Sequence, residues 1–391
     1  GFTMLTPQEN KIAQKMIELK NASGSHSPSI FTIIKEIPEI RIKIDACFLS
    51  NPYATNLFID YMQKELIDTH KLRSVLEFYP SQNAVIAQHL AQILGVDSHC
   101  IFISNGAIEA IQAVLHTFVQ GKIIVNIPTF SSYYEFVTPQ TKVIYYELSK
   151  DNDYKLSIKS YIDFVKKHKP QSVVLINPNN PNGDYLPLDC MCEILQNLSE
   201  VKNVIIDESF IHFAYESEDL ELISNISLFQ KFPNVILLKS MSKDFGIAGI
   251  RIGYAIMQKE KIEKLLKNGY LWNSNGLSEY FFRIYAEQTF RDRYEIVRKS
   301  YIAQTQDFFA NLAQIKGLKV YPSMANFALL ELINGVKSSD FAIKMLLKYG
   351  IYIRTCNDKI GLQGEFIRLA SRTKEENDVM VSALKDLFQL S

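Results

Sequence analysis

Short β-rich runs alternate with helical patterns over the central part of this chain. Six such runs lie between Leu72 and Met257, at 122–127, 142–147, 172–176, 203–206, 234–238 and 252–257. Some of them, such as the run from Val173 to Ile176, are continuously apolar, as a strand is when both faces of its sheet are buried. This alternation predicts an α/β fold with a mainly parallel central sheet covered by helices on both faces.

The pattern changes after about residue 260, where long helical segments begin. They are followed by the elements of a smaller α+β domain: strands near 317–321 and 327–332, a helix from about Ser339, and a last pair of strands around Tyr352 and Phe366. We therefore expect two domains, a large one over 55–270 and a small one over 271–391.

The first 54 residues have the character of an N-terminal arm. Thr6-Pro7-Gln8-Glu9 has the form of a capping box with proline at the first helical position, so a helix is predicted to run to about Lys20. A polar linker, 21–28, follows it. Because the arm is short and not basic, it lacks the character of a DNA-binding module.

Composition narrows the class of partner. The 42 Lys and Arg residues balance 42 Asp and Glu residues, which argues against binding to nucleic acid or to an anionic membrane surface. Five scattered cysteines suggest free thiols in a reducing compartment, with no metal-ligand spacing. No apolar run reaches the length of roughly 18 residues that a membrane helix needs. We expect a cytoplasmic protein whose partners are small molecules or a second copy of the chain, with no metal site.

The most informative stretch, 240–254, follows a predicted strand. It contains Lys243, with Ser240 and Ser242 before it and Arg251 eight residues after it. A lysine that forms an imine must be held partly neutral, and a fixed cation nearby lowers its pKa and can anchor a phosphate. Considered alone, the stretch could also be a turn of small residues with a surface lysine.

This stretch resembles the lysine motif of fold-type I enzymes that use pyridoxal 5'-phosphate (PLP). The resemblance implies that Lys243 holds the cofactor as a Schiff base and that Arg251 binds its phosphate. It also implies that Ser240 and Ser242 contribute to cofactor binding. It also implies a fold like that of aspartate aminotransferase. Lys239 lies in the same stretch but before the motif serine, so we rank it far below Lys243.

Two further motifs follow buried strands and fit the same family. A carboxylate at the end of a buried strand is costly unless it meets a cation, and the resemblance implies that Asp207 keeps the pyridine nitrogen protonated. In the turn 177–183, Asn180 matches the asparagine that binds the 3'-oxygen of the ring. Phe210 stands where many aminotransferases have a tyrosine, and threonine-phosphate decarboxylases tolerate phenylalanine there.

The predicted helix after Ser104 offers free N–H groups to an anion. The resemblance places the cofactor phosphate on the amides of Ala107 and Ile108, although a helix start alone is an ordinary feature. It also makes Phe130 the aromatic side chain that stacks on the pyridine ring. An aromatic residue at such a place is more often part of the core.

Motifs near both ends resemble those of histidinol-phosphate aminotransferases and their decarboxylase relatives. Asn51-Pro52-Tyr53 implies that Tyr53 contacts substrate, and Tyr79 before Pro80 implies contact with the cofactor phosphate of the other subunit in a homodimer. Arg354 and Arg368 match the arginines that bind an anionic group of the substrate, a task that suits the planar guanidinium.

The favoured interpretation is a homodimeric PLP-dependent aminotransferase with shared active sites. In it, Lys243 is both the covalent anchor and the general acid and base. An amino donor and an acceptor, one of them bearing a phosphate, phosphonate or carboxylate, would be its substrates. The alternatives are a decarboxylase of the threonine-phosphate type, an aminophosphonate transaminase and, least favoured, a PLP-binding regulator without catalysis.

Overall fold

The computed structural model describes residues 5–24 and 28–389. Its central feature is a seven-stranded sheet with the order β2-β8-β7-β6-β5-β3-β4. Strand β8 is antiparallel to both of its neighbours, and the other pairs are parallel. The strands are β2 (Ile101–Asn105), β3 (Gly121–Ile127), β4 (Thr141–Glu147), β5 (Ser172–Ile176), β6 (Asn203–Asp207), β7 (Val235–Ser240) and β8 (Ile252–Ile256).

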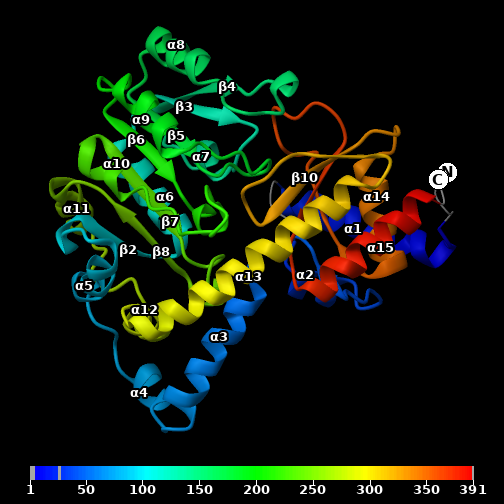
Figure 1. Cartoon of the computed structure of the whole chain (residues 1–391), viewed down its shortest axis with the longest axis horizontal. Coiled ribbons are helices and arrows are strands. Elements are labelled where there is room, and N and C mark those ends of the chain that lie inside the picture. The colour runs from blue at the N-terminus through cyan, green and yellow to red at the C-terminus, as the bar shows by residue number, and fades with distance from the viewer. Residues whose placement is uncertain (1–4, 25–27, 390–391) are drawn as a thin grey trace.

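Helices cover both faces of this sheet (Figure 1). Successive residues of each strand point to opposite sides, so the apolar strands present apolar side chains to helices on both faces. On one face, Ile123 and Val125 join the core cluster of α6, whereas Ile124 faces the cluster that α5, α8 and α9 help to form. The helices around the sheet are α5 (Asn83–Leu94), α6 (Gly106–Phe118), α7 (Ser132–Glu135), α8 (Ile158–His168), α9 (Leu188–Gln196), α10 (Ile226–Lys231), α11 (Lys259–Leu266) and α12 (Gly276–Tyr285). The predicted fold class is confirmed.

A second, four-stranded antiparallel sheet has the order β12-β13-β10-β9. It packs with α14 and α15 and with the end of α13 around a separate apolar core. The elements are α13 (Gln288–Ala313), β9 (Leu318–Val320), β10 (Phe327–Leu332), α14 (Ser338–Tyr349), β11 (Ile351–Tyr352), β12 (Arg354–Thr355), β13 (Phe366–Ala370) and α15 (Lys374–Gln389). The predicted α+β unit is therefore present. In Figure 1 the long helix α13 extends from the large sheet toward this unit.

The N-terminal arm packs on the small unit. Helix α1 (Pro7–Ser23) begins with the predicted capping box, because the side chains of Thr6 and Glu9 each accept a hydrogen bond from the other's backbone N–H. Helix α2 (Ile30–Glu36) follows, and strand β1 (Ile44–Asp45) pairs in parallel with β11. Within the described residues, no helix combines the length and apolar character needed to cross a bilayer.

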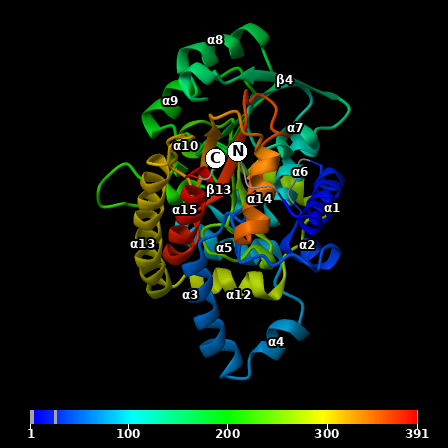
Figure 2. The ribbon, with the colours of Figure 1, turned by 90° about the vertical axis from the view of Figure 1, so that its right-hand side faces the viewer.

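A segment between the arm and the large sheet projects from the body of the molecule in both views (Figures 1 and 2). It consists of α3 (Pro52–Met62), a π-helical turn (Gln63–Ile67) and α4 (Leu72–Glu77). Helix α12, which begins after the predicted boundary at residue 270, packs beside α4 and α5. The boundaries at 54/55 and 270/271 remain predictions.

Candidate active site

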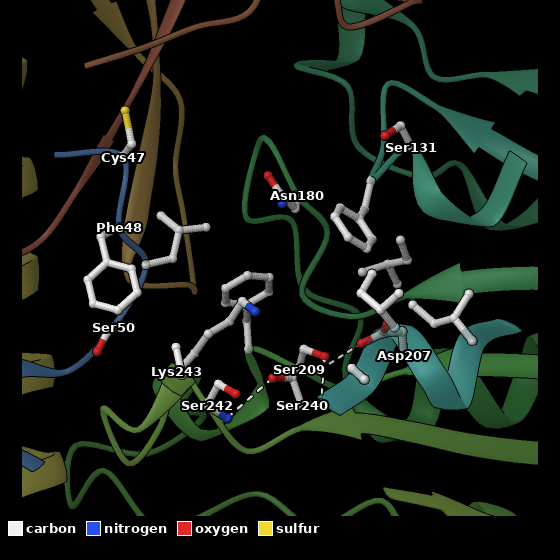
Figure 3. A pocket seen from close by; sticks show the side chains of 18 of the residues that line it. Cys47, Phe48, Ser50, Ser131, Asn180, Asp207, Ser209, Ser240, Ser242 and Lys243 are labelled. Carbon is white, nitrogen blue, oxygen red and sulfur yellow. Dashed lines mark hydrogen bonds between the residues drawn. The ribbon is translucent and has the colours of Figure 1, made fainter. Parts of the chain in front are cut away.

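A cavity of about 330 Å³ lies at the edge of the large sheet where the parallel strands end. Ligands in α/β proteins bind at this edge, outside the carboxyl ends of the strands. The small unit closes its other side, and Figure 3 shows Lys243 between Phe48 and Ser50 on one side and Asp207 on the other. Its lining includes Ala107, Ile108, Phe130, Asn180, Asp207, Phe210, Ser240, Ser242, Lys243, Arg251, Arg354, Lys359 and Arg368.

Lys243 follows β7 and is partly accessible from this cavity. Burial lowers the pKa of its ammonium group, and Lys239 and Arg368 add to the effect, while Asp207 and Asp244 oppose it. Its Nζ lies 5.5 Å from the centre of the Phe210 ring. A lysine with a lowered pKa is suited to act as a nucleophile and as a proton carrier.

Lys239, the rival lysine, has a different environment. Its Nζ forms an ion pair with Asp244 Oδ2 at 2.6 Å and donates a hydrogen bond to the carbonyl oxygen of Glu208 at 3.2 Å. The side chain is buried, and it is not part of the cavity lining. Lys239 is therefore engaged in a buried ion pair, whereas Lys243 faces the cavity.

Asp207 is the last residue of β6 and is held on both carboxylate oxygens. Its Oδ2 accepts a hydrogen bond from the Tyr133 hydroxyl at 2.6 Å, and its Oδ1 accepts one from the backbone N–H of Ser209 at 2.9 Å. Burial raises the pKa of the Tyr133 phenol well above its ordinary value, and the Asp207 charge raises it further. Tyr133 therefore remains a donor and fixes the orientation of the carboxylate.

One end of the cavity is a cradle for an anion. Ala107 and Ile108 lie in the first turn of α6, whose N–H groups carry a partial positive charge. The guanidinium group of Arg251 packs against Gly106 at the start of this helix, where an added Cβ would lie only 2.5 Å from Nη2. The backbone of Gly106 also has a φ of +79°, which favours glycine. A Cβ on Gly253 would approach the Ala107 nitrogen to 2.7 Å. Both positions therefore need glycine.

Serines connect the strand ends beneath the cavity (Figure 3). The N–H of Ser242 donates to Ser240 Oγ at 3.2 Å, and the N–H of Ser240 donates to Ser209 Oγ at 3.0 Å. These serine contacts set the position of Lys243 relative to the ends of β6 and β7.

Phe130 lies on the cavity wall. Its ring meets the Tyr133 ring edge to face, with centroids 6.5 Å apart.

The small unit contributes cations to the other end of the cavity. Arg354 and Arg368 are direct cross-strand partners on β12 and β13. Arg368 Nη1 donates to Asn180 Oδ1 at 2.9 Å, and within the described residues its buried Nε has no acceptor. Arg354 forms an ion pair with Asp358, with N···O distances of 2.6 and 2.7 Å. An unpaired buried donor facing the cavity favours an anionic ligand.

Two predicted site residues lie elsewhere in this chain. The Tyr53 hydroxyl donates to Gln304 Oε1 at 2.8 Å and accepts from the Lys374 N–H at 2.9 Å, outside the cavity lining. Tyr79 follows the projecting helix α4, and its side chain is 96% exposed. The roles proposed for both tyrosines stay predictions.

Residues 48–384 match the model of the family described as aminotransferase class I and II. The chain belongs to this family. Its resemblance to histidinol-phosphate aminotransferases is confirmed by relatives of that name. The chain is thus a fold-type I, PLP-dependent enzyme. A histidinol-phosphate aminotransferase from Sinorhizobium meliloti, solved in complex with PLP, shares its fold, with a TM-score of 0.76 and 18% identity over 100% of this chain and 98% of that one.

More similar relatives are decarboxylases. The L-serine phosphate decarboxylase of Campylobacter jejuni is 63% identical over 385 residues, which cover 98% of this chain and 99% of the relative. That of Sulfurospirillum multivorans is 49% identical over 371 residues, 95% of each protein. A solved structure of a decarboxylase from Sulfurospirillum multivorans has a TM-score of 0.95 and 48% identity, covering 98% of both chains.

The cavity fits the cofactor that the family uses. The cradle of Arg251 and the first turn of α6 suits its phosphate, and the oriented carboxylate of Asp207 suits a protonated ring nitrogen. Lys243, partly accessible and of lowered pKa, suits the covalent link. Among the described residues, no cluster of side chains suits a metal ion.

Two residues at the site, Tyr133 and Lys359, were not predicted from the sequence. Tyr133 lies three residues after Phe130, close to the end of β3, so its nearness to a strand end was the available signal. Lys359 lies in a loop of the small unit and reaches the cavity only through the packing of that unit against Thr129. No local pattern marks such a residue.

Proposed function

We propose that this enzyme is a PLP-dependent decarboxylase that converts O-phospho-L-serine into O-phosphoethanolamine and carbon dioxide. The observation that carries the proposal is the 63% identity to an L-serine phosphate decarboxylase along nearly the whole length of both proteins. The sequence motifs alone favoured amino transfer, with decarboxylation as the alternative. The comparisons favour that alternative.

In this reaction the bond between Cα and the carboxylate breaks, its electron pair stays with Cα, and a proton takes the place of the carboxylate. The bound cofactor supplies the electron-withdrawing ring that makes the bond labile. Asp207, fixed by Tyr133 and by the N–H of Ser209, keeps the ring nitrogen protonated. Phe210 adds an apolar wall beside Lys243.

Lys243 is the group that delivers the new proton to Cα. Its Nζ lies in the cavity, and burial lowers its pKa, so the ammonium can give up a proton more readily than an exposed lysine. Arg251 and the first turn of α6 hold the cofactor phosphate, while Arg368 meets the substrate carboxylate.

We further propose that two copies of the chain share their active sites through the projecting segment. Large apolar side chains are exposed along it and just beyond it: Ile59, Ile67, Leu76, Phe78 and Tyr79. Several exposed large apolar side chains on one segment favour its contact with another protein surface. Tyr79 of one copy would then reach the cofactor phosphate of the other.

The direct test incubates the purified holoenzyme with O-phospho-L-serine and measures carbon dioxide release, with the organic product followed by phosphorus NMR. We expect one O-phosphoethanolamine for each carbon dioxide, and no product from the Lys243→Ala variant. O-phospho-L-threonine and L-histidinol phosphate serve as comparison substrates. Conversion of the bound cofactor to its amine form without carbon dioxide would show amino transfer instead.

A further inference from the structure

Lys359 is a buried cation in the active-site cavity that the reaction described above does not use. It follows β12 in a loop of the small unit, and its side chain is only 7% exposed overall. It lines the same cavity as Lys243, Arg354 and Arg368. Its Nζ donates one hydrogen bond, to the backbone carbonyl oxygen of Thr129 at 3.3 Å.

The ammonium group of Lys359 is incompletely paired. It has three donors, of which the Thr129 carbonyl accepts one. Among the described residues, Lys359 forms no ion pair, and the neighbouring carboxylate of Asp358 pairs with Arg354 instead. A buried ammonium group with unused donors costs free energy. An anionic ligand that accepts hydrogen bonds from those donors would remove this cost.

The cations around Lys359 outnumber the carboxylates that pair with them. Arg354 and Arg368 lie directly opposite each other on β12 and β13, and like charges in that position repel. Asp358 balances Arg354 through a two-point ion pair. Within the described part of the chain, neither Arg368 nor Lys359 has a carboxylate partner of its own. A single substrate carboxylate can balance only one of these two cations.

The proton affinities agree with this imbalance. Burial, followed by the charges of Arg368 and Arg354, lowers the pKa of Lys359 to about 8. Burial and Arg354 lower the pKa of Arg368 to about 10. An anion bound between the two groups would reverse both effects, because it favours the charged forms.

We propose that Lys359 binds the phosphate group of the substrate, while Arg368, hydrogen-bonded to Asn180, binds its carboxylate. The inference rests on the proposed function, since it takes a phosphorylated amino acid as the substrate class. A phosphate carries about 1.5 to 2 negative charges near neutral pH, and a lysine serves it as a compact charge. Lys359 thus determines the preference for a phosphorylated over an unphosphorylated amino acid.

Binding to the holoenzyme, measured by calorimetry with two ligands, tests this assignment. O-phosphoethanolamine carries a phosphate but no carboxylate, and L-serine carries a carboxylate but no phosphate. We expect Lys359→Met to weaken binding of O-phosphoethanolamine by about tenfold or more. Its affinity for L-serine should change by less than about twofold. Lys359→Arg should recover most of the lost affinity.

Lys319→Met is the matched control, because Lys319 also belongs to the small unit but pairs with Asp153 at the surface. It should bind both ligands as the wild type does. An equal loss for both ligands in Lys359→Met would show that Lys359 only ties its loop to Thr129, and an unchanged affinity for O-phosphoethanolamine would also overturn the assignment. Carbon dioxide release is not needed here, so the failure of the proposed reaction can be recognised separately.

Discussion

The hydroxyl of Tyr133 donates a 2.6 Å hydrogen bond to Oδ2 of Asp207, and both side chains are buried. Tyr133 belongs to the short helix α7 after β3, whereas Asp207 ends β6. The bond therefore connects two strand ends beneath the cofactor site. Since the proposed role of Asp207 is to keep the ring nitrogen of the cofactor protonated, we propose that Tyr133 acts as a positioning residue for its carboxylate.

The variant Tyr133→Phe removes this donor and leaves one carboxylate oxygen of Asp207 without it. A hydrogen bond to a charged group contributes about 1.5–3 kcal/mol, so we expect turnover to fall by roughly ten- to a hundredfold. Cofactor retention, measured by equilibrium dialysis, should also weaken. The control is Tyr161→Phe, since the buried Tyr161 hydroxyl has no partner in the described residues. Equal effects of both variants would contradict the role of Tyr133.

The buried ion pair between Lys239 and Asp244 provides a second prediction. The two groups are 2.6 Å apart, and their side chains are 3% and 0% exposed. Lys239→Met should lower the free energy of unfolding by about 3–5 kcal/mol, because it leaves a buried charge uncompensated. Lys64→Met breaks an exposed pair with Asp60 and should cost no more than about 1 kcal/mol. Denaturant unfolding measures the free energy of unfolding of both variants. A similar loss in the two variants would contradict the importance of the buried pair.

Glu208 makes stability depend on pH. Burial raises the pKa of its carboxyl group to about 7, against the opposing charge of Lys239. The folded state therefore holds this proton more tightly than the unfolded state. The resulting stability is complete below pH 4.5 and is lost as the pH rises through about 7.

The variant Glu208→Gln removes this titration, and glutamine can still accept the hydrogen bond that Asn225 donates at 3.1 Å. We expect the variant to gain thermal stability relative to the wild type as the pH rises from about 5 to about 8. The gain in the free energy of unfolding should not exceed about 3 kcal/mol. Melting temperatures across this pH range measure it, and a constant difference between the two proteins would refute the shifted pKa.

Site residues close to the end of a strand could be predicted from the sequence. The five parallel-strand runs of the large sheet corresponded to β3 to β7, and Asn180, Asp207 and Lys243, which family motifs at the ends of these runs had singled out, all line the cavity. Strand β2 was missed because it leads directly into α6, so that its last residues were assigned to the start of the helix.

Residues placed by packing between units were not predictable. The contact of Lys359 with Thr129 spans 230 positions of the chain, and no period or turn signal encodes it. The motif at Tyr53 predicts contact with substrate, and in this chain the Tyr53 hydroxyl hydrogen-bonds to Gln304 and the Lys374 N–H, so that role stays a prediction. Local sequence identifies strand ends, whereas tertiary packing decides which side chains meet across them.

Phe210 gives a spectroscopic prediction. Its ring lies 5.5 Å from Lys243 Nζ and meets the Phe327 ring edge to face at 4.9 Å. In Phe210→Tyr, an added hydroxyl near the bound cofactor would stabilise the anionic ring oxygen. The pH titration of the cofactor's visible absorbance should therefore shift to lower pH. An unchanged or higher midpoint would show that residue 210 does not face that oxygen.

The last prediction concerns the shared active site. Tyr79 is 96% exposed in the single chain and lies outside the cavity, so it can act on a cofactor only in another copy. We expect Lys243→Ala and Tyr79→Ala to be strongly impaired when each is assayed alone. In a hybrid dimer of the two variants, one site carries both defects, whereas the other has an intact Lys243 and an intact Tyr79.

Mixing the two variants should therefore restore activity under conditions that allow subunits to exchange. Random exchange makes half of the dimers hybrids, each with one intact site, so the recovered activity should approach about a quarter of the wild-type value. Size-exclusion chromatography of differently tagged chains shows independently that exchange has occurred. Mixing Lys243→Ala with itself is the control and should recover nothing. If exchange occurs and no activity returns, Tyr79 does not complete the site of a partner copy, and the shared arrangement is wrong.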